Sequence, residues 1–257
     1  MVFQDRMDAS AVANTAQRSL RNFFRNCVEI AITLYTTDHE LRTAVPMVGH
    51  EHLDAALNKG TGVLILSAHL GNFFLLGTRL AVDGYPVHVL VNQPRDGRFA
   101  ELMDRYRLKI KQRTIHARPR PAALKRLHEV LRANEIAVVI ADEYRPGNGI
   151  AVPLFGRTVT ARRGPATLAL RTNAAVVPAS VIRQPDDSLK LVIETELELD
   201  RSGKSKAEVR ENTIRITQWL ERMILRYPDQ WNWMNIYWAE APPTDPLAAG
   251  QPIRHAS

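Results

Sequence analysis

The 257-residue chain has an ordinary globular composition, with 45% hydrophobic and 24% charged residues, so we do not expect a disordered protein. Its single cysteine, Cys27, excludes a disulfide framework and a cysteine-rich metal site, and fits a reducing compartment. No segment reaches the roughly 18 consecutive apolar residues of a membrane-spanning helix, and the first twenty residues lack the apolar stretch of a signal peptide. We therefore expect a cytoplasmic protein that contacts any membrane peripherally.

The net charge of +7 is concentrated in one segment. Between residues 104 and 132, ten lysine and arginine residues stand against two acidic ones. Such a segment attracts a phospholipid surface, a nucleic acid, a phosphorylated ligand or an acidic carrier protein. A solvated basic face without a dedicated partner is the alternative. The segment has no recognised nucleic-acid-binding motif and no aromatic stacking platform, so no nucleic-acid partner is expected.

The first predicted element is a helix over residues 10–34, where apolar residues recur at three- and four-residue spacing. Arg18, Arg21 and Arg25 fall near the opposite face of this helix. The pattern fits a membrane-surface helix with a basic flank, and equally a helix that packs on the core. Any membrane contact would use this helix and the basic segment.

Predicted strands and helices alternate through the rest of the chain. Apolar, β-branched runs predict strands at residues 62–67, 86–92, 136–141, 175–182 and 189–197. Helical patterns occupy residues 52–57, 73–82, 99–108, 121–133, 164–172 and 204–226. This alternation predicts an α/β protein whose mostly parallel sheet is flanked by helices. The short "RQPDDS" between the last two strands predicts a hairpin that makes the sheet mixed.

No repeat, low-complexity linker or domain boundary divides the sequence. We therefore expect a single domain over residues 1–257, in which residues 1–17 and 241–257 are peripheral tails.

A histidine follows the first of these strands, in "GVLILSAHLGNFFLLGTRL". Ligands of open α/β sheets bind beyond the carboxyl ends of the strands, where His69 could act as a general base toward a hydroxyl group. Gly71 and Asn72, at the expected start of the next helix, predict backbone N–H groups that face developing negative charge. A structural histidine is the alternative interpretation.

Other chemistries are poorly supported. Ser67 lacks the G-x-S-x-G turn of a serine hydrolase. His50 and His52 lack the helical spacing of paired metal ligands and have no cysteine nearby, so no metal site is expected.

Around His69 the sequence resembles the lauroyl and myristoyl acyltransferases of lipid A biosynthesis, within the lysophospholipid acyltransferase superfamily. The resemblance covers roughly residues 18–240 and rests on three segments in the family's order: "VPMVGHEHLDAALNKGTGVLILSAHLGN", "IADEYRPGNGIAVPLFGRTVTARRGPATLALRTNAAVVPASVIR" and "NTIRITQWLERMILRYPDQWNWMNIYW".

This resemblance implies a glycerol-3-phosphate-acyltransferase-like fold. It implies transfer of a fatty acyl group from acyl carrier protein or acyl-CoA to a hydroxyl of a glycolipid or related lipid at the inner membrane surface, without a metal or prosthetic group. His69 would be the base, and Asn72 with nearby backbone amides would polarise the thioester. The basic segment would suit an acidic carrier protein or a phosphorylated lipid.

The family's catalytic acid is missing from its usual place. In the family a Glu or Asp follows the histidine by five residues, but here that position is Phe74, and Phe73 takes the usual Trp position. Asp142 and Glu143 are the candidate replacements, because they follow a strand that should end at the same sheet edge. The family also has an Asp at the position of Asp142, which could be structural.

The distance from His69 to the nearest carboxylate distinguishes an active enzyme from an inactive binding protein. A carboxylate within hydrogen-bond reach of the ring, about 3.2 Å, would favour an enzyme. Without one, we expect a weakened or inactive homologue that binds lipid or carrier, in which Phe74 extends an apolar groove.

The resemblance also gives candidate substrate-binding residues, which are Gly71, Phe74, Arg105, Arg107, Arg162 and Gly164. The three arginines would bind phosphate. Gln93 replaces an arginine of the family, and Arg162 and Arg163 stand where small or hydroxyl residues are usual. A C-terminal aromatic cluster could lie at a lipid interface or pack the last helix on the sheet; it comprises Trp219, Trp231, Trp233, Tyr237 and Trp238.

Overall fold

The apolar runs of the sequence form the central strands of a sheet, because their side chains are buried on both faces. In the computed structural model, β2 (Val63–Ser67) is buried along its whole length. Val63 and Ile65 pack into the core on one face of the sheet, and Leu64 and Leu66 pack into the core on the other. Such two-sided burial explains why the run is continuously apolar rather than alternating.

The structure describes residues 7–94, 96–145, 147, 149–203 and 206–235. Its helices are α1 (Ala9–Ile32), α2 (Asp38–Ala44), α3 (His50–Leu57), α4 (Leu76–Val82), α5 (Gly97–Lys109), α6 (Arg120–Arg132), α7 (Gly164–Thr172), α8 (Lys206–Arg226) and the 3₁₀ turn η1 (Trp233–Asn235). Its strands are β1 (Met47–Val48), β2, β3 (Val87–Val91), β4 (Arg113–His116), β5 (Ile136–Ile140), β6 (Ile150–Leu154), β7 (Arg157–Ala161), β8 (Ala175–Arg183) and β9 (Leu189–Ile193).

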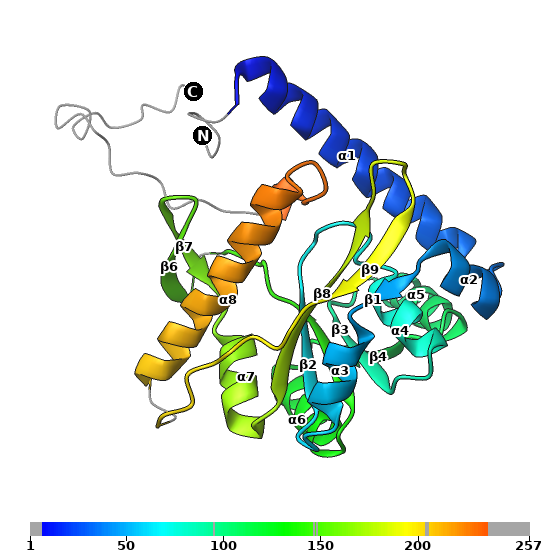
Figure 1. Cartoon of the computed structure of the whole chain (residues 1–257). Coiled ribbons are helices and arrows are strands. Elements are labelled where there is room, and N and C mark those ends of the chain that lie inside the picture. Colours follow the sequence, from blue (N-terminus) through cyan, green and yellow to red (C-terminus); the bar gives the residue numbers. More distant parts are fainter. Residues whose placement is uncertain (1–6, 95, 146, 148, 204–205, 236–257) are drawn as a thin grey trace, which may run out of the picture.

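The described residues form a seven-stranded sheet in the order β1-β9-β8-β2-β5-β3-β4 and a separate β6-β7 hairpin. The pairing of β8 with β9 is antiparallel, and the other pairs of the large sheet are parallel. Helices α3 and α4 lie over one face of the sheet, and α6 and α7 lie over the other, where α8 packs on α7 and β6 (Figure 1).

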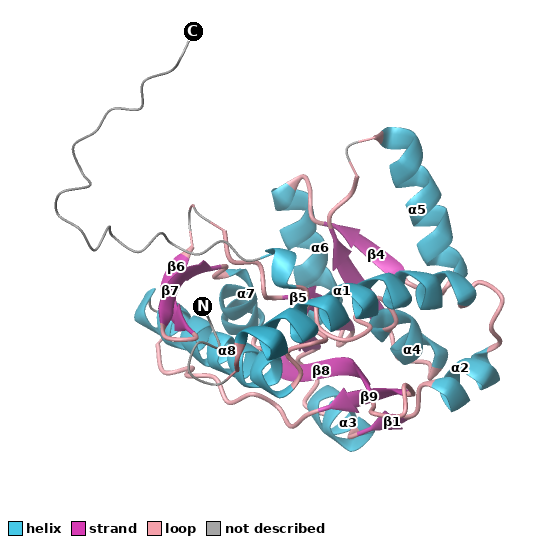
Figure 2. Cartoon of the chain, turned by 90° about the horizontal axis from the view of Figure 1, so that it is seen from above, coloured by secondary structure: helices cyan, strands magenta, loops and turns pink. Residues whose placement is uncertain are grey.

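Helix α1 crosses the molecule on its outside. It runs past the β8-β9 hairpin in Figure 1 and lies nearest the viewer in Figure 2, where the sheet is behind it. Its side chains and backbone meet distant parts of the chain. Ser19 donates a hydrogen bond to the carbonyl of Trp231, and Tyr106 on α5 donates one to the carbonyl of Ile30.

The predicted fold class is confirmed: the described residues form an α/β structure with a mostly parallel, mixed sheet flanked by helices. The predicted β8-β9 hairpin is also confirmed. Helix α4 begins at Leu76 rather than Phe73, since the residues before it form turns. The elements that were not predicted are short or lack a strong apolar period: β1, β4, α2, the β6-β7 hairpin and η1.

The N-terminal tail was predicted too long. Residues from Ala9 onward belong to α1, and Thr15 is buried, so this part of residues 1–17 is integral to the fold. Residues 241–257 lie outside the described residues.

Candidate active site

Strand register brings His69 and Asp142 together. In the parallel β2-β5 pair, Ser67 lies opposite Ile140, and the backbone N–H of Ala141 donates to the carbonyl of Ser67 at 2.9 Å. His69 and Asp142 each lie two residues beyond this last pair. The His69 Nδ1 and Asp142 Oδ1 atoms are 2.8 Å apart.

The Asp142 carboxylate is fully buried and contacts both the ring and the backbone of His69. Its Oδ2 atom accepts hydrogen bonds from the backbone N–H of His69 at 2.9 Å and from Trp231 Nε1 at 2.7 Å. Because an ionised carboxylate can only accept, it orients the ring with Nδ1–H toward Asp142. Nε2 then remains as the basic nitrogen.

The pKa of His69 lies above its ordinary value. Burial favours the neutral ring and lowers the pKa, but the hydrogen bond and negative charge of Asp142, with a further contribution from Glu143, outweigh it. The His69 side chain retains 20% of its exposure, so the imidazole is both reachable and basic. This is the arrangement of a general base with an orienting acid.

The two candidate acids occupy different positions. Asp142 contacts the ring of His69, whereas Glu143 contacts Asn92 Nδ2 at 3.4 Å and lies 3.9 Å from Arg162 Nε. Glu143 therefore acts on His69 through its charge, and Asp142 through direct contact.

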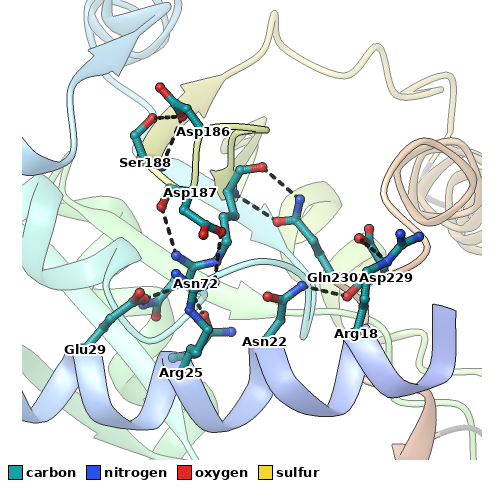
Figure 3. Close-up of polar contacts among 12 residues, drawn as sticks. Arg18, Asn22, Arg25, Glu29, Asn72, Asp186, Asp187, Ser188, Asp229 and Gln230 are labelled. Atoms are coloured by element: carbon teal, nitrogen blue, oxygen red, sulfur yellow. Dashed lines mark hydrogen bonds and ion pairs between the residues drawn. The ribbon is translucent and has the colours of Figure 1, made fainter. Parts of the chain in front are cut away.

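Asn72 and Gly71 do not face the site as predicted. The Asn72 side chain is fully buried and donates to Glu29 Oε2 at 2.7 Å (Figure 3). The backbone N–H groups of Gly71 and Asn72 donate to the carbonyls of Gln230 and Val181. These hydrogen bonds fix the loop after β2. The prediction that the two N–H groups face developing negative charge on a substrate was wrong, because both already donate to protein carbonyls.

Phe73 contacts the histidine, and Phe74, at the position of the family acid, packs behind Phe73. The Phe73 ring meets the His69 ring edge-on, with centroids 4.9 Å apart. Phe74 packs on Phe73 at 4.1 Å and approaches Phe23 of α1 at 6.3 Å. Phe74 therefore joins the loop to α1.

The remaining predicted binding residues are dispersed. Arg105 and Arg107 lie on α5, which packs against β4, and β5 and β3 separate β4 from β2. The ion-pair partner of Arg107 is Asp104 on the same helix, at 3.4 Å. Gly164 begins α7 directly after Arg162 and Arg163. Of the predicted arginines, Arg162 is the one that lies near Glu143, the residue after Asp142.

Trp231 is a site residue that the sequence analysis did not identify as such. It is fully buried, donates to Asp142, and forms a bridge with Leu70. Because 89 residues separate it from Asp142, no local pattern could reveal the contact. Trp219, on α8, is also buried, in the same core cluster as Trp231. These two tryptophans therefore fit the interpretation that the aromatic cluster packs the C-terminal helix on the sheet. Tyr237 and Trp238 lie outside the described residues.

Among the described helices, none has both the length and the apolar character needed to cross a bilayer.

Two similar proteins of known sequence share the name phosphatidylinositol mannoside acyltransferase. The chain is 25% identical over 213 residues to phosphatidylinositol mannoside acyltransferase of Mycolicibacterium smegmatis, a match that covers 81% of this chain and 67% of that one. It is 30% identical over 132 residues to the protein of the same name from Mycobacterium tuberculosis (strain H37Rv), covering 51% of this chain and 42% of that one. The latter match thus spans less than half the length of the relative.

A family model gives the broadest match. The model described as bacterial lipid A biosynthesis acyltransferase matches residues 2–239. This confirms the resemblance inferred from the motifs around His69, and it spans both the histidine–aspartate pair and Trp231. The chain therefore belongs to the bacterial lipid A biosynthesis acyltransferase family.

Proposed function

We propose that this chain transfers a fatty acyl group from a thioester donor, acyl carrier protein or acyl-CoA, to a hydroxyl group of a glycolipid. The observation that carries the proposal is the 2.8 Å contact between His69 Nδ1 and Asp142 Oδ1. It supplies the orienting acid that the sequence motif lacks, and it leaves Nε2 to remove a proton. Family membership supports the same reaction class.

The chemistry needs one base that later acts as an acid. His69 Nε2 takes the proton of the acceptor hydroxyl while the oxygen attacks the thioester carbonyl carbon. The C–O bond forms, the C–S bond breaks, and the departing thiolate takes the proton back from the imidazolium. Asp142 keeps the ring oriented and stabilises its positive charge in the same way as the aspartate of the serine-protease triad.

The acceptor class is inferred from relatives. Two relatives are named for a mannosylated phosphatidylinositol and the family for lipid A; both names denote glycolipids with phosphate groups. Arg162, close to Glu143 and 44% exposed along its side chain, is suited to meet such a phosphate. Access to a lipid acceptor would take place at the inner membrane surface.

An inactive binding protein is the competing function. It requires that no carboxylate contact His69, and the Asp142 contact speaks against it. Phe74 takes the place of the family acid without leaving the histidine unpartnered.

The test is acyl transfer from labelled acyl-CoA and acyl carrier protein to phosphatidylinositol mannosides and to lipid A precursors. We expect transfer by the wild type, a loss of roughly 10²–10⁴-fold in kcat for His69→Ala, and little change for the control His39→Ala, an exposed histidine on α2. Absence of transfer to any acceptor, or full activity of His69→Ala, would contradict the proposal.

A further inference from the structure

Helix α1 buries polar residues and exposes a stripe of apolar ones. The buried residues of this helix are Thr15, Ser19 and Asn26. An apolar stripe with a four-residue spacing faces outward instead, comprising Leu20, Phe24, Val28 and Ile32, with 48%, 61%, 60% and 55% exposure. A helix that packs on a globular core through its apolar stripe has the reverse arrangement. Helix α1 packs on the fold through Ile30 and Phe23, while the stripe stays exposed.

The inward face is fixed by specific hydrogen bonds, as Figure 3 shows in part. Ser19 Oγ donates to the carbonyl of Trp231 at 2.5 Å, Asn22 Nδ2 to that of Asp229 at 2.9 Å, and Asn26 Nδ2 to that of Gly71 at 2.7 Å. Rolling α1 to bury the apolar stripe would break these bonds and leave polar groups unpaired. The outward stripe is therefore built into the fold.

Positive charge borders the stripe. Helical spacing places the exposed Arg21 and the half-buried Arg25 along one side of it. Arg25 also pairs with Asp187 at 2.8 Å, and Arg18 lies nearer the inward face, where it pairs with Asp229 at 3.2 Å. The acidic residue of the helix, Glu29, pairs inward with Arg183 at 2.7 Å. A shallow hollow of about 460 Å³ on this surface is lined by two arginines, two apolar side chains and the acidic one: Arg21, Arg25, Phe24, Val28 and Glu29.

We propose that α1 lies in the plane of an anionic lipid bilayer, with the apolar stripe among the acyl chains and the exposed Arg21 at the phosphate groups. An exposed apolar face bordered by basic residues is the composition that binds such an interface. From residue 20 to 32 the stripe runs for about 18 Å. A second copy of the chain is a poorer occupant, because pairing two such faces brings their arginines together.

Docking at α1 would place the candidate site beside the bilayer. On its inner side, α1 contacts the loop that follows His69 through Asn26, Glu29 and Phe23. A lipid acceptor could then approach the histidine from the membrane surface. This consequence rests on the proposed function, whereas the docking surface itself does not.

The single cysteine of the sequence provides a probe on this helix. Cys27 is exposed and lies three residues after Phe24, next to the stripe. Burial raises the pKa of its thiol, so labelling with an environment-sensitive fluorophore is done at mildly alkaline pH. We expect a blue shift of the emission with vesicles of phosphatidylcholine and phosphatidylglycerol, and lipid-borne quenchers should reduce it.

The variants test the surface directly by cosedimentation. Phe24→Gln/Val28→Gln should lower partitioning to these vesicles at least about tenfold. The control Val48→Gln, the same change at a half-exposed valine of β1, should not. Arg21→Gln should weaken binding about fivefold on anionic vesicles. Glutamine favours a helix at least as well as valine or phenylalanine, and circular dichroism checks that α1 is retained.

Three results would overturn the docking proposal: no sedimentation of the wild type, unchanged binding of the double variant, or a wild-type dimer that the double variant makes monomeric. His69→Ala should bind vesicles like the wild type, so a failure of acyl transfer is distinguished from a failure of docking.

Discussion

At the scale of single residues, Asp142 determines what His69 can do. It accepts hydrogen bonds from the backbone and ring of His69 and from Trp231. Its negative charge makes the imidazole a stronger base than a free histidine, while its hydrogen bond fixes which nitrogen faces solvent. Basicity and orientation therefore have one source.

The pH dependence of transfer should report this basicity. The neutral ring is the active form, and because the pKa of His69 is raised, activity should fall on the acid side with a midpoint above the ordinary histidine value of about 6.5. Asp142→Asn removes the charge that raises the pKa, so the midpoint should move to lower pH while kcat falls by roughly 10²–10⁴-fold.

Rate profiles of the wild type and Asp142→Asn, measured with the same donor and acceptor, check the prediction. Glu143→Gln is the matched control, since it removes a nearby carboxylate that does not contact the ring. It should shift the midpoint slightly and retain most of the activity. Equal losses in both variants would contradict the separate roles.

Restoring the family acid should not help this chain. Phe74→Glu places a carboxylate at the family position, but Asp142 already occupies Nδ1 of His69, and the Phe74 ring packs between Phe73 and Phe23. We expect transfer to stay level or decrease, and the free energy of unfolding to fall by about 1–3 kcal/mol. Steady-state kinetics and urea unfolding measure both. A gain in kcat would mean that Asp142 does not serve as the acid.

At the scale of elements, the loop after β2 is shaped by a glycine. Gly71 has a φ of +57°, and a Cβ atom there would lie 2.0 Å from the carbonyl oxygen of Val181. Since Asn232 donates to the carbonyl of His69 and Asn26 to that of Gly71, moving this loop would move the histidine.

Gly71→Ala should therefore impair both stability and activity. We expect the free energy of unfolding to fall by roughly 2–4 kcal/mol, because the backbone must shift to admit the methyl group. Gly97→Ala is the control: Gly97 begins α5 and has open space around its Cβ position. Urea unfolding of the two variants gives the comparison, and equal stability would show that the loop adapts without cost.

The strand ends could be predicted from the sequence, and the contacts across the chain could not. Continuous apolar runs located β2 and β5, and the parallel arrangement then placed His69 and Asp142 at one edge. The sequence did not distinguish Asp142 from Glu143, because that depends on which side chain points along the edge. Trp231 and the inward face of α1 depend on hydrogen bonds between residues far apart in the chain.

At the scale of the whole molecule, the described elements are held together in two ways. The sheet and its covering helices bury aliphatic side chains on both faces. The fully buried side chains of α1 are polar instead, and α1 joins the rest through hydrogen bonds, the ion pairs Arg18–Asp229 and Arg25–Asp187, and the partly buried Phe23 and Ile30. Periodicity predicted that α1 is a helix but left open which face lies inward, since an apolar stripe looks the same whether core or lipid covers it.

This difference in attachment predicts two levels of local stability. Segments with few buried apolar contacts open with a lower free energy than core strands, so the amide hydrogens of α1 should exchange at least about 100-fold faster than those of β2, β5 and β8. Hydrogen–deuterium exchange followed by mass spectrometry measures both. Equal protection would show that the polar contacts hold α1 as firmly as the core.

Anionic vesicles should slow exchange in α1 and leave the strands unchanged, because a docked helix opens only after leaving the bilayer. Fast exchange of α1 that vesicles do not slow would contradict the docking surface without affecting the arrangement of α1 on the fold.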